Sequence, residues 1–405
     1  KTNMLKKIIH SFIRPRQPWR TMKFDELSEI YTSMTLRSLG FGIIGVFVPI
    51  FLYQSGVSLQ DIFMFYATFF LCRIPVAYVA SYVVARIGPK HSIAVSTIIF
   101  IFFLGLLLSY ESVGWPLPIL AIWYTVANGL FFLAYNTDFS KIKDSKHGGK
   151  ELGWLYIFER AGSAFGPVVG GLIATFISPD ATILVAILVM LGALIPLFMT
   201  SEPVKVHQKI TYRGFSPKKY KADFISLSAF NIENVATVAL WPLLAGVFIF
   251  TEDTYAKLGA VIGISMMVSM FSARMFGKFI DAKKGLHLLQ YGVVLNAVTH
   301  VIRTFITTGA GVVAVSVINE PTTLSYRMPL VKGLYDAADT HTGYRIVYLT
   351  WMEMIAALAK GLFCVALFVA CYFADPITVL RVSFIPVAFI SLGILLQRFP
   401  ALKKV

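Results

Sequence analysis

The chain has 405 residues, of which 57% are hydrophobic and only 14% are charged, whereas about 25% of the residues in an ordinary soluble domain are charged. The mean hydropathy of +0.72 excludes a soluble enzyme, and repeated apolar runs of roughly 18 residues or more indicate membrane-spanning helices rather than a β-barrel. The net charge of +15 would suit a nucleic-acid-binding protein, but its distribution along the chain, described below, argues against such a partner.

Residues 1–27 form a basic segment that precedes the first long apolar run. Apolar residues follow helical spacing within it, which predicts a short amphipathic helix on the cytoplasmic membrane surface. These residues are Leu5, Ile8, Ile9, Phe12 and Ile13. A basic, flexible tail is an equally consistent interpretation of the same segment, because lysine and arginine are frequent there.

We predict twelve membrane-spanning helices, each long enough to cross a bilayer at roughly 20 residues per span. Their approximate limits are residues 28–53, 59–85, 92–110, 115–138, 152–177, 180–200, 223–250, 256–279, 286–307, 309–330, 343–372 and 376–398. The fold class that follows is an all-α membrane protein.

The charges in the turns between the spans support this count. Turns after even-numbered spans are rich in basic residues, for example Arg86 and Lys90 after the second span and Lys283 and Lys284 after the eighth. Turns after odd-numbered spans carry mostly Asp and Glu, with Lys257 as the plain exception. By the positive-inside rule, both termini and the even-numbered turns are expected in the cytoplasm of a multi-pass protein of the plasma (inner) membrane. The net positive charge therefore reflects topology, and we expect no nucleic-acid partner.

A polar stretch in the middle divides the chain into two halves of six spans each. We predict an N-terminal bundle (28–200), a cytoplasmic linker (201–222), a C-terminal bundle (223–398) and a cytoplasmic tail (399–405). The halves echo each other at an offset of about 191–197 residues, since Leu133–Tyr135 corresponds to Leu324–Tyr326 and Glu159 to Glu353. Two six-helix pseudo-repeats are therefore expected.

The fifth span contains the most distinctive motif, E-R-A-G-S-A-F-G-P-V-V-G-G. Three of its glycines lie four residues apart and share one helix face, which lets another helix approach to backbone contact. The proline is expected to weaken or kink the helix. The motif residues are Glu159, Arg160, Gly162, Gly166, Pro167, Gly170 and Gly171. The pattern G-x-x-x-G-P-x-x-G-G resembles the fifth-helix signature of the drug/proton antiporter branch of the major facilitator superfamily, and a generic small-residue packing helix is the alternative.

The turns after the second and eighth spans also resemble this superfamily, whose pattern there is approximately G-x-L-A-D-R-x-G-R-K. The matching residues are Arg86, Gly88, Lys90, Gly277 and Asp281. The resemblance implies that these turns help to latch the cytoplasmic side in the outward-facing state. The first copy has Ala85 in place of the acid, so Asp281 is expected to supply more of this latch. A positive-inside turn with a helix-ending glycine is the alternative.

Polar side chains near the middle of the spans are the candidate substrate and proton sites. An ionised group in hydrocarbon costs about 2.5–3.5 kcal/mol even on mild insertion scales, so its presence calls for a partner or a function. The candidates are Arg37, Asn128, Asn231, Glu233, Asn234, Asn319, Glu320, Glu353 and Lys360. In the resembled fold, the first, fourth, seventh and tenth spans line a central cavity, and several of these residues lie on those spans.

The candidates differ in the role that their chemistry allows. Arg37 stays charged at any relevant pH, so we expect it to bind an anionic group of the substrate or to neutralise a carboxylate. A carboxylate that lacks a cation in a low-dielectric cavity has a raised pKa, so Glu233 or Glu320 is expected to load and release a proton near neutral pH, as coupled transport requires. Structural ion pairs, for example of Glu353 with a neighbouring cation, are the alternative.

Other charged residues within the spans are interpreted as structural. Arg73 and Arg274 lie nearer the inner halves of their spans, from which long side chains reach the interface. His300 and Arg303 lie toward the outer end of the ninth span and are expected off the main cavity.

The resemblance implies a secondary transporter that moves a small molecule by alternating access, and we expect proton-coupled export of an amphipathic or drug-like solute. Proton-coupled uptake, or movement of a lipid-like or anionic solute, is the alternative. It is favoured by Arg37 and by the absence of the Arg that such antiporters usually carry in the fourth span. The expected partners are the small-molecule substrate, protons and the lipid bilayer, and the expected state is a monomer.

We expect no enzymatic activity, cofactor or metal site. The sequence contains no H-E-x-x-H, no nucleotide-binding glycine loop and no nucleophile elbow. Its three cysteines all lie in apolar spans and have neither metal-ligand spacing nor a disulfide framework. A receptor or scaffold that does not transport is the remaining hypothesis, and it would bind a ligand without flux.

Overall fold

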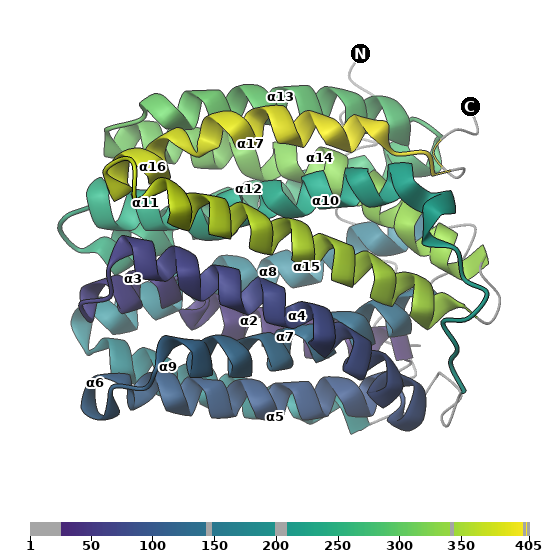
Figure 1. The fold of residues 1–405 in the computed structure, drawn as a ribbon, viewed down its shortest axis with the longest axis horizontal. Coiled ribbons are helices and arrows are strands. Elements are labelled where there is room, and N and C mark those ends of the chain that lie inside the picture. The colour runs from purple at the N-terminus through teal and green to yellow at the C-terminus, as the bar shows by residue number, and fades with distance from the viewer. Residues whose placement is uncertain (1–25, 143–147, 199–208, 341–343, 400–401, 403–405) are drawn as a thin grey trace, which may run out of the picture.

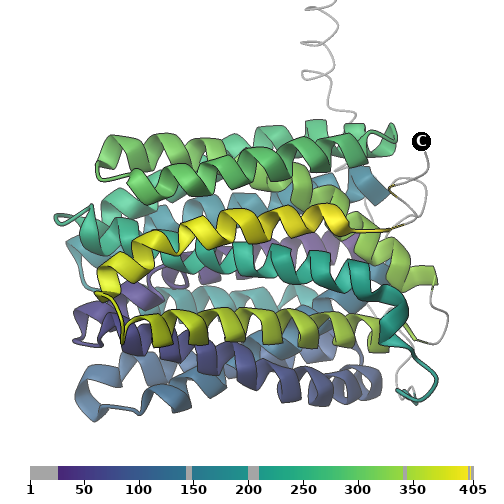
Figure 2. The same ribbon diagram turned by 45° about the horizontal axis from the view of Figure 1, so that its top comes forward.

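The computed structural model describes residues 26–142, 148–198, 209–340, 344–399 and 402, with the backbone alone for 26–30, 139–142, 148–156, 198 and 339–340. Within these ranges all regular structure is helical. The helices lie side by side as one bundle, and the connecting turns gather at its two ends (Figures 1 and 2).

The six spans predicted for the N-terminal half all appear as helices, close to their predicted limits. They are α2 (Glu26–Ile44) with α3 (Val48–Gln54), α4 (Leu59–Ile87), α5 (Pro89–Leu108), α7 (Leu117–Ile142), α8 (Gly148–Phe176), and α9 (Pro179–Leu194) with η2 (Pro196–Phe198). A short helix, α6 (Tyr110–Val113), lies between α5 and α7. Hydropathy located these elements well because a helix in lipid must satisfy every backbone polar group internally.

The C-terminal half has the corresponding six spans, two of them built from consecutive segments. The seventh span is α10 (Lys221–Val235), the π-helical turn η4 (Ala236–Leu240) and α11 (Trp241–Phe248), preceded by η3 (Pro217–Tyr220). Then follow α12 (Thr254–Asp281), α13 (Gly285–Phe305), α14 (Gly309–Thr340), α15 (Arg345–Ala370), and finally α16 (Pro376–Val382), α17 (Phe384–Ser391) and η5 (Leu392–Leu396). The π turn lies just before Pro242, whose missing N–H interrupts the regular hydrogen-bond ladder.

Nine helical segments in the described part of the chain are long and apolar enough to cross a membrane. The remaining predicted spans correspond to α9, which is apolar but shorter, and to the long helices α8 and α14. The structure is therefore all-α and consistent with twelve spans.

The tenth helix is longer than predicted, because α14 continues to Thr340 instead of ending near residue 330. The added turns mix apolar residues with charged ones, and Lys332 Nζ donates to Asp336 Oδ2 over 2.7 Å one turn further on. Such a pair supports helix where hydropathy no longer does. The prediction ended early because it followed apolar character alone.

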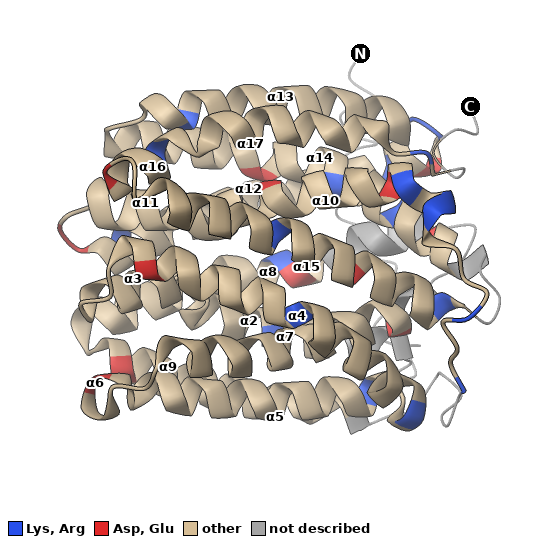
Figure 3. Cartoon of the chain, viewed as in Figure 1, with Lys and Arg blue, Asp and Glu red and all other residues tan. Residues whose placement is uncertain are grey.

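The two ends of the bundle differ in their charged residues, although both signs also occur at mid-bundle (Figure 3). Lys and Arg residues gather at the end where α10 begins, and Asp and Glu residues occur at the other end near α3, α6 and α16. The alternation read from the turns thus corresponds to two distinct ends of the molecule. We refer to them below as the basic end and the acidic end.

The predicted N-terminal segment (1–27) and tail (399–405) lie almost wholly outside the described residues. The linker is described from residue 209 onward. There, the Phe215 ring stacks on Tyr220 with 5.6 Å between centroids and contacts Tyr348 of α15 edge-on. The second part of the linker is therefore packed against the last half of the chain.

The two predicted halves contact each other at both ends of the bundle. At the acidic end, the Phe47 and Tyr255 rings lie 5.2 Å apart, and Tyr255 Oη donates to Gln54 Oε1 over 2.6 Å. At the basic end, Tyr335 Oη donates to Asn136 Oδ1 over 2.8 Å. A movement that opens one end must break that end's contacts while the other set persists.

Candidate functional site

The predicted glycine face of α8 packs directly on α2. A Cβ atom on Gly166 would lie 2.7 Å from both Gly42 Cα and the Leu39 carbonyl oxygen. Cβ atoms on Gly162 and Gly170 would likewise collide with backbone carbonyl oxygens of α2. The predicted approach of another helix to backbone contact is confirmed, and α2 is that helix.

The opposite side of the same motif packs on α12. A Cβ on Gly171 would collide with a backbone carbonyl of α12, and one on Gly259 of α12 would collide with the Pro167 carbonyl. A Cβ on Gly263 would lie 2.8 Å from the Ala164 carbonyl oxygen. α8 continues as one helix through Pro167, so the proline does not end it. The motif therefore seats α8 between a helix of its own half and a helix of the other half.

Adding one methyl group to this face tests its packing. Gly162→Ala is expected to lower the stability of the folded protein by about 1–3 kcal/mol, as overpacking a close backbone contact does. Thermal unfolding of the purified protein in detergent would measure the loss. Gly192→Ala in α9 is the matched control, because a Cβ there has no atom within 4 Å; an equal loss in both variants would contradict the packing role.

Two ion pairs join α8 to α14 at the contact between the predicted halves. Arg160 Nη1 donates to Glu320 Oε2 over 2.8 Å, and both side chains are largely shielded. Arg327 Nη2 lies 3.7 Å from Glu159 Oε1. Glu159 and Arg160 of the fifth span thus face the tenth span. Each of the two pairs balances one positive charge with one negative charge.

A third pair joins α4 to α15 on another part of the contact between the halves. Arg73 Nε donates to Glu353 Oε2 over 3.1 Å. The interpretation of Arg73 as a structural residue is therefore confirmed, although its side chain binds Glu353 instead of reaching the membrane interface, and the alternative of an ion pair for Glu353 is confirmed as well. Lys360, two turns beyond Glu353, is buried with its Nζ 4.9 Å from the Phe70 ring centroid.

Arg37 is buried without a carboxylate partner within ion-pair distance in the described part of the chain. It is 5% exposed, its Nη1 donates to Thr97 Oγ1 over 2.8 Å, and its guanidinium carbon lies 3.7 Å from the Phe131 ring centroid. An aromatic face and a hydroxyl stabilise a cation but do not neutralise it. Of the two roles expected for Arg37, binding an external anion is the one that remains open.

Arg37, Arg73 and Lys360, which we call the cationic cluster, share electrostatic neighbours. The Tyr124 hydroxyl interacts with both Arg37 and Arg73, and Lys360 interacts with both Arg73 and Glu353. Glu353 is the one carboxylate that pairs with the cluster among the described residues. Glu353 compensates Arg73, whereas Arg37, which stays charged, has no carboxylate within ion-pair distance among the described residues and leaves an excess of positive charge.

A second polar cluster lies inside the C-terminal half, between α10, η4 and α13. Glu233 Oε1 accepts a 2.7 Å hydrogen bond from Thr237 Oγ1 and lies 3.3 Å from His300 Nε2. Arg303 Nη1 donates to Thr237 Oγ1 over 3.0 Å and lies 3.3 Å from His300 Nδ1. Glu233 and His300 are 0% exposed and Arg303 is 1% exposed. This group, with Tyr326 beside it, is called the Glu233 cluster.

The partners in this cluster assign its protons. Arg303 can only donate, so His300 Nδ1 accepts from it and His300 Nε2 carries the hydrogen that is donated to Glu233. His300 is then neutral, and the carboxylate of Glu233 balances the charge of Arg303. Glu233 Oε2 forms no hydrogen bond by geometry with the described residues, and the Tyr326 hydroxyl interacts with the same carboxylate.

The condition under which Glu233 and Glu320 were expected to load a proton is not met, because each carboxylate has a cationic neighbour. Arg303 interacts with Glu233, and Arg160 binds Glu320. His300 and Arg303, which were expected off the main cavity, lie inside the C-terminal half, where His300 contacts Glu233 and Arg303 contacts Thr237. The sequence could not show this because which spans pack together is not visible in their hydropathy.

The asparagine candidates are engaged mainly within their own helices. Asn128 and Asn231 each donate to a carbonyl four residues earlier, over 3.0 and 2.8 Å. Asn319 donates to the Thr323 hydroxyl over 3.2 Å. Asn234 is half-buried. These contacts give no sign of a shared binding position, so their assignment to a cavity stays a prediction.

The predicted gating turns have the geometry of sharp helix connections. Gly88 separates α4 from α5 with a φ of 87°, a conformation that favours glycine. Lys90 is buried and Arg86 is exposed, while Gly277 is buried within α12 and Asp281 is its exposed last residue. Both turns lie at the basic end, and their latching role stays a prediction.

Comparison with known families gives the identity of this fold. Residues 30–402 match the family described as the Major Facilitator Superfamily. The chain belongs to this superfamily. It is an integral, multi-pass membrane protein and a transporter rather than an enzyme. No curated protein sequence matches the chain significantly.

Solved structures of transporters share this superfamily fold at low sequence identity. The chain is similar to the human organic anion transporter MFSD10 (TETRAN), with a TM-score of 0.67, 10% identity, and coverage of 92% of this chain and 98% of that one. It is also similar to FucP in the outward conformation, with a TM-score of 0.63, 12% identity, and coverage of 91% and 96%. Another match is the E. coli fucose:proton symporter FucP in a variant form, at a TM-score of 0.61 and 12% identity over 90% and 97%.

Proposed function

We propose that this superfamily member transports an organic anion by alternating access and couples the movement to protons. The observation that carries the proposal is the cationic cluster. Arg37 and Lys360 are buried within the spans, and neither has a carboxylate within ion-pair distance in the described ranges. Burying an unpaired cation is costly, and an anionic substrate would provide the missing counter-charge.

The structural relatives are in line with this class of substrate. One similar protein is described as an organic anion transporter, and another as a fucose:proton symporter. At identities near 10% these likenesses show a shared fold, so they support the substrate and the coupling ion only as proposals. The cationic cluster carries the argument within this chain.

The Glu233 cluster is the proposed proton site. Its carboxylate has one oxygen that forms no hydrogen bond by geometry with the described residues and a second oxygen held by Thr237 and His300. Protonation of Glu233 would leave Arg303 uncompensated, so the two charge states place different electrostatic demands on the surrounding helices. The π turn η4 follows immediately, and π turns are frequent at functional sites. The seventh span is therefore suited to respond to this proton.

Export of an amphipathic or drug-like solute is the second candidate. The glycine motif of α8, which resembles that of drug/proton antiporters, favours it, and its glycines seat α8 against both α2 and α12. The excess positive charge of the cationic cluster favours an anionic substrate over a cationic one, and many drugs are cations. We further propose that the protein lies in the plasma membrane with its basic end on the cytoplasmic side, and that it acts as a monomer.

Transport into vesicles separates these candidates. Purified protein would be reconstituted into liposomes and tested with matched organic anions, zwitterions and cations under an imposed pH gradient, while an internal dye reports proton movement. Saturable movement of anions accompanied by protons is the expected result. Movement of amphipathic cations alone would favour the second candidate, and binding without flux would favour a receptor.

Arg37→Gln tests the substrate class in the same assay. We expect the KM for the anion to rise by roughly tenfold or more, since one charge-assisted contact contributes about 1.5–3 kcal/mol. Arg37→Lys, which keeps the charge, should recover part of the affinity. The matched control is Arg274→Gln, because Arg274 is exposed on α12. An unchanged KM in Arg37→Gln would remove Arg37 from the binding site.

A further inference from the structure

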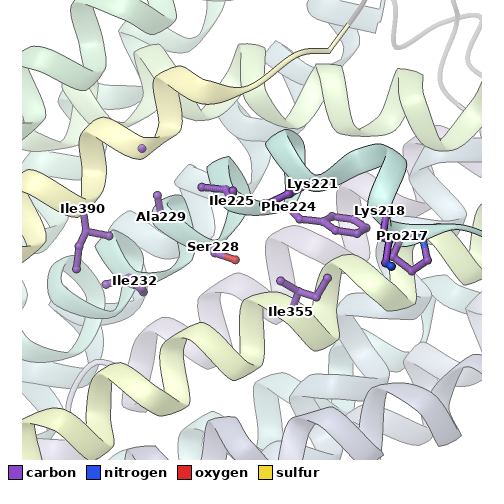
Figure 4. Close-up of a pocket in the computed structure, with 11 residues that line it drawn as sticks. Pro217, Lys218, Lys221, Phe224, Ile225, Ser228, Ala229, Ile232, Ile355 and Ile390 are labelled. Carbon is purple, nitrogen blue, oxygen red and sulfur yellow. The ribbon is translucent and has the colours of Figure 1, made fainter.

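A groove with a volume of about 520 Å³ runs along α10 on the side of the C-terminal half. Its lining residues come from η3, α10, α15, α17 and η5, and none comes from the N-terminal half. Figure 4 shows Ile355 of α15 and Ile390 of α17 on either side of α10. α15, α10 and α17 lie at the front surface of the bundle in Figure 1. The groove therefore opens on the outer, membrane-facing side and not between the halves, where alternating access takes place.

The walls of the groove are apolar and its depth comes from small residues. Ile225, Ile232 and Ile355 supply the walls, and Ile225 is 42% exposed. Ala229 of α10 and Gly393 of η5 meet at the base, where a Cβ on Gly393 would lie 3.1 Å from the Ala229 Cβ. The volume falls within the range of about 300–1,000 Å³ that is usual for small-molecule sites.

Two lysines mark one end of the groove. Lys218 on η3 and Lys221 at the start of α10 line it, and both are exposed. The nearest carboxylate in sequence, Asp223, is buried and accepts the backbone N–H of Arg398 over 2.7 Å. Neither lysine forms an ion pair with another described residue, and both belong to the basic end of the molecule.

The length of the groove matches one leaflet of a bilayer. From Lys221 to Ile232 the helix advances roughly 16 Å at about 1.5 Å per residue. The hydrocarbon core of a leaflet is about half of the roughly 30 Å that a bilayer core measures. An acyl chain lying along α10 would therefore have its headgroup at the lysines and its end near mid-membrane.

We infer that this groove binds one phospholipid with an anionic headgroup from the leaflet at the basic end. Lys218 and Lys221 contact the phosphate and the headgroup charge, and one acyl chain lies between Ile355 and Ile390. The positive lysine end and the apolar walls complement the two parts of such a lipid. The site is separate from the cationic cluster, so the inference does not depend on which solute is transported.

Photolabelling in vesicles tests the inference directly. The protein would be reconstituted into vesicles of phosphatidylcholine containing a trace of phosphatidylglycerol or phosphatidylcholine that carries a diazirine on its acyl chain. Peptides would then be mapped by mass spectrometry. We expect labels on residues 225–232 and 390–393, with phosphatidylglycerol labelling roughly tenfold more than phosphatidylcholine.

Two variants distinguish a built site from the general lipid layer around any membrane protein. Lys218→Gln/Lys221→Gln should bring the ratio of labelling by phosphatidylglycerol to labelling by phosphatidylcholine close to one. Lys278→Gln/Lys284→Gln, which removes two exposed lysines elsewhere at the same end, should leave this ratio unchanged. Ser228→Phe, which fills the groove, should abolish labelling there with either lipid. Lys218 and Lys221 are exposed, so we expect the variants that replace them to fold normally.

Three results would overturn the inference. Equal labelling by both lipids in the unaltered protein would mean an ordinary lipid layer. If phosphatidylglycerol still labels Lys218→Gln/Lys221→Gln more than phosphatidylcholine does, these lysines do not recognise the headgroup. Labelling that a transported anion abolishes would make the groove an entry path for the solute instead of a lipid site.

Discussion

Replacing Glu233 by glutamine is expected to abolish accumulation of the anion driven by a pH gradient, while exchange without a gradient continues. A gradient of one pH unit is worth about 1.4 kcal/mol per proton, which supports roughly tenfold accumulation. Glutamine keeps the shape of the side chain and can still accept from Thr237, whose hydroxyl donates to Glu233 over 2.7 Å, but it carries no titratable proton. Accumulation should therefore fall from about tenfold to none, measured by uptake of labelled anion into liposomes.

Loss of folding must be separated from loss of coupling in this variant. Removing one partner of a buried pair costs about 3–5 kcal/mol, and Glu233→Gln leaves Arg303 without its counter-charge. Thermal unfolding would report that cost. Glu233→Gln/Arg303→Gln removes both charges and should regain much of the stability while coupling stays absent. Glu252→Gln, at an exposed position in the turn before α12, is the control that should accumulate normally.

Two outcomes would contradict the proton-site assignment. If Glu233→Gln still accumulates the anion tenfold, the proton binds elsewhere. If Glu233→Gln/Arg303→Gln restores both stability and accumulation, the cluster serves packing alone. Either result would shift attention to Glu320, whose carboxylate also lies within the spans and is bound by Arg160.

The sequence predicted the helices well because their formation is dictated locally. Each predicted span corresponds to a helix, and the glycine face of α8 packs on backbone as its spacing indicates. The charge alternation in the turns corresponds to two distinct ends. The helices and the charge alternation follow from the bilayer, which demands internal hydrogen bonding, apolar surfaces and basic turns on one side. The packing of α8 follows from the small residues that share one of its faces.

The partners of the intramembrane charges were beyond such local rules. Arg160 and Glu320 lie 160 positions apart in the chain, and Glu233 and His300 lie 67 apart. Hydropathy does not say which helices touch, so the cluster around Glu233 was not anticipated. One signal was available: His300 and Arg303 lie three residues apart in an apolar span, on one helix face, and both need partners there.

Reversing the charge of Arg160 is expected to stop transport, and reversing Glu320 as well is expected to restore it. The Arg160→Glu variant would place two carboxylates where one 2.8 Å ion pair now joins α8 to α14. Leaving a shielded charge unpaired costs about 3–5 kcal/mol, which corresponds to a loss of more than roughly hundredfold. Initial rates of anion uptake for both single variants and for Arg160→Glu/Glu320→Arg would measure the coupling energy as a double-mutant cycle. Glu111→Gln, which removes an exposed charge bonded to Ser55, should change the rate by less than twofold.

Because the pair lies between the two predicted halves, the double-mutant cycle also tests whether the orientation of the pair matters for transport. Because α8 and α14 belong to the two predicted halves, which would move against each other in the proposed alternating access, the pair can stabilise one conformation more than another. A swapped variant that recovers stability but not the uptake rate would mean that orientation of the pair matters when the halves separate. Equal recovery of both would mean that any attraction at this position suffices.

The pair of Arg73 and Glu353 shares no residue with the pair of Arg160 and Glu320, so breaking both pairs should have nearly additive effects on the rate. A strong departure from additivity would show that the two contacts open in a single concerted step.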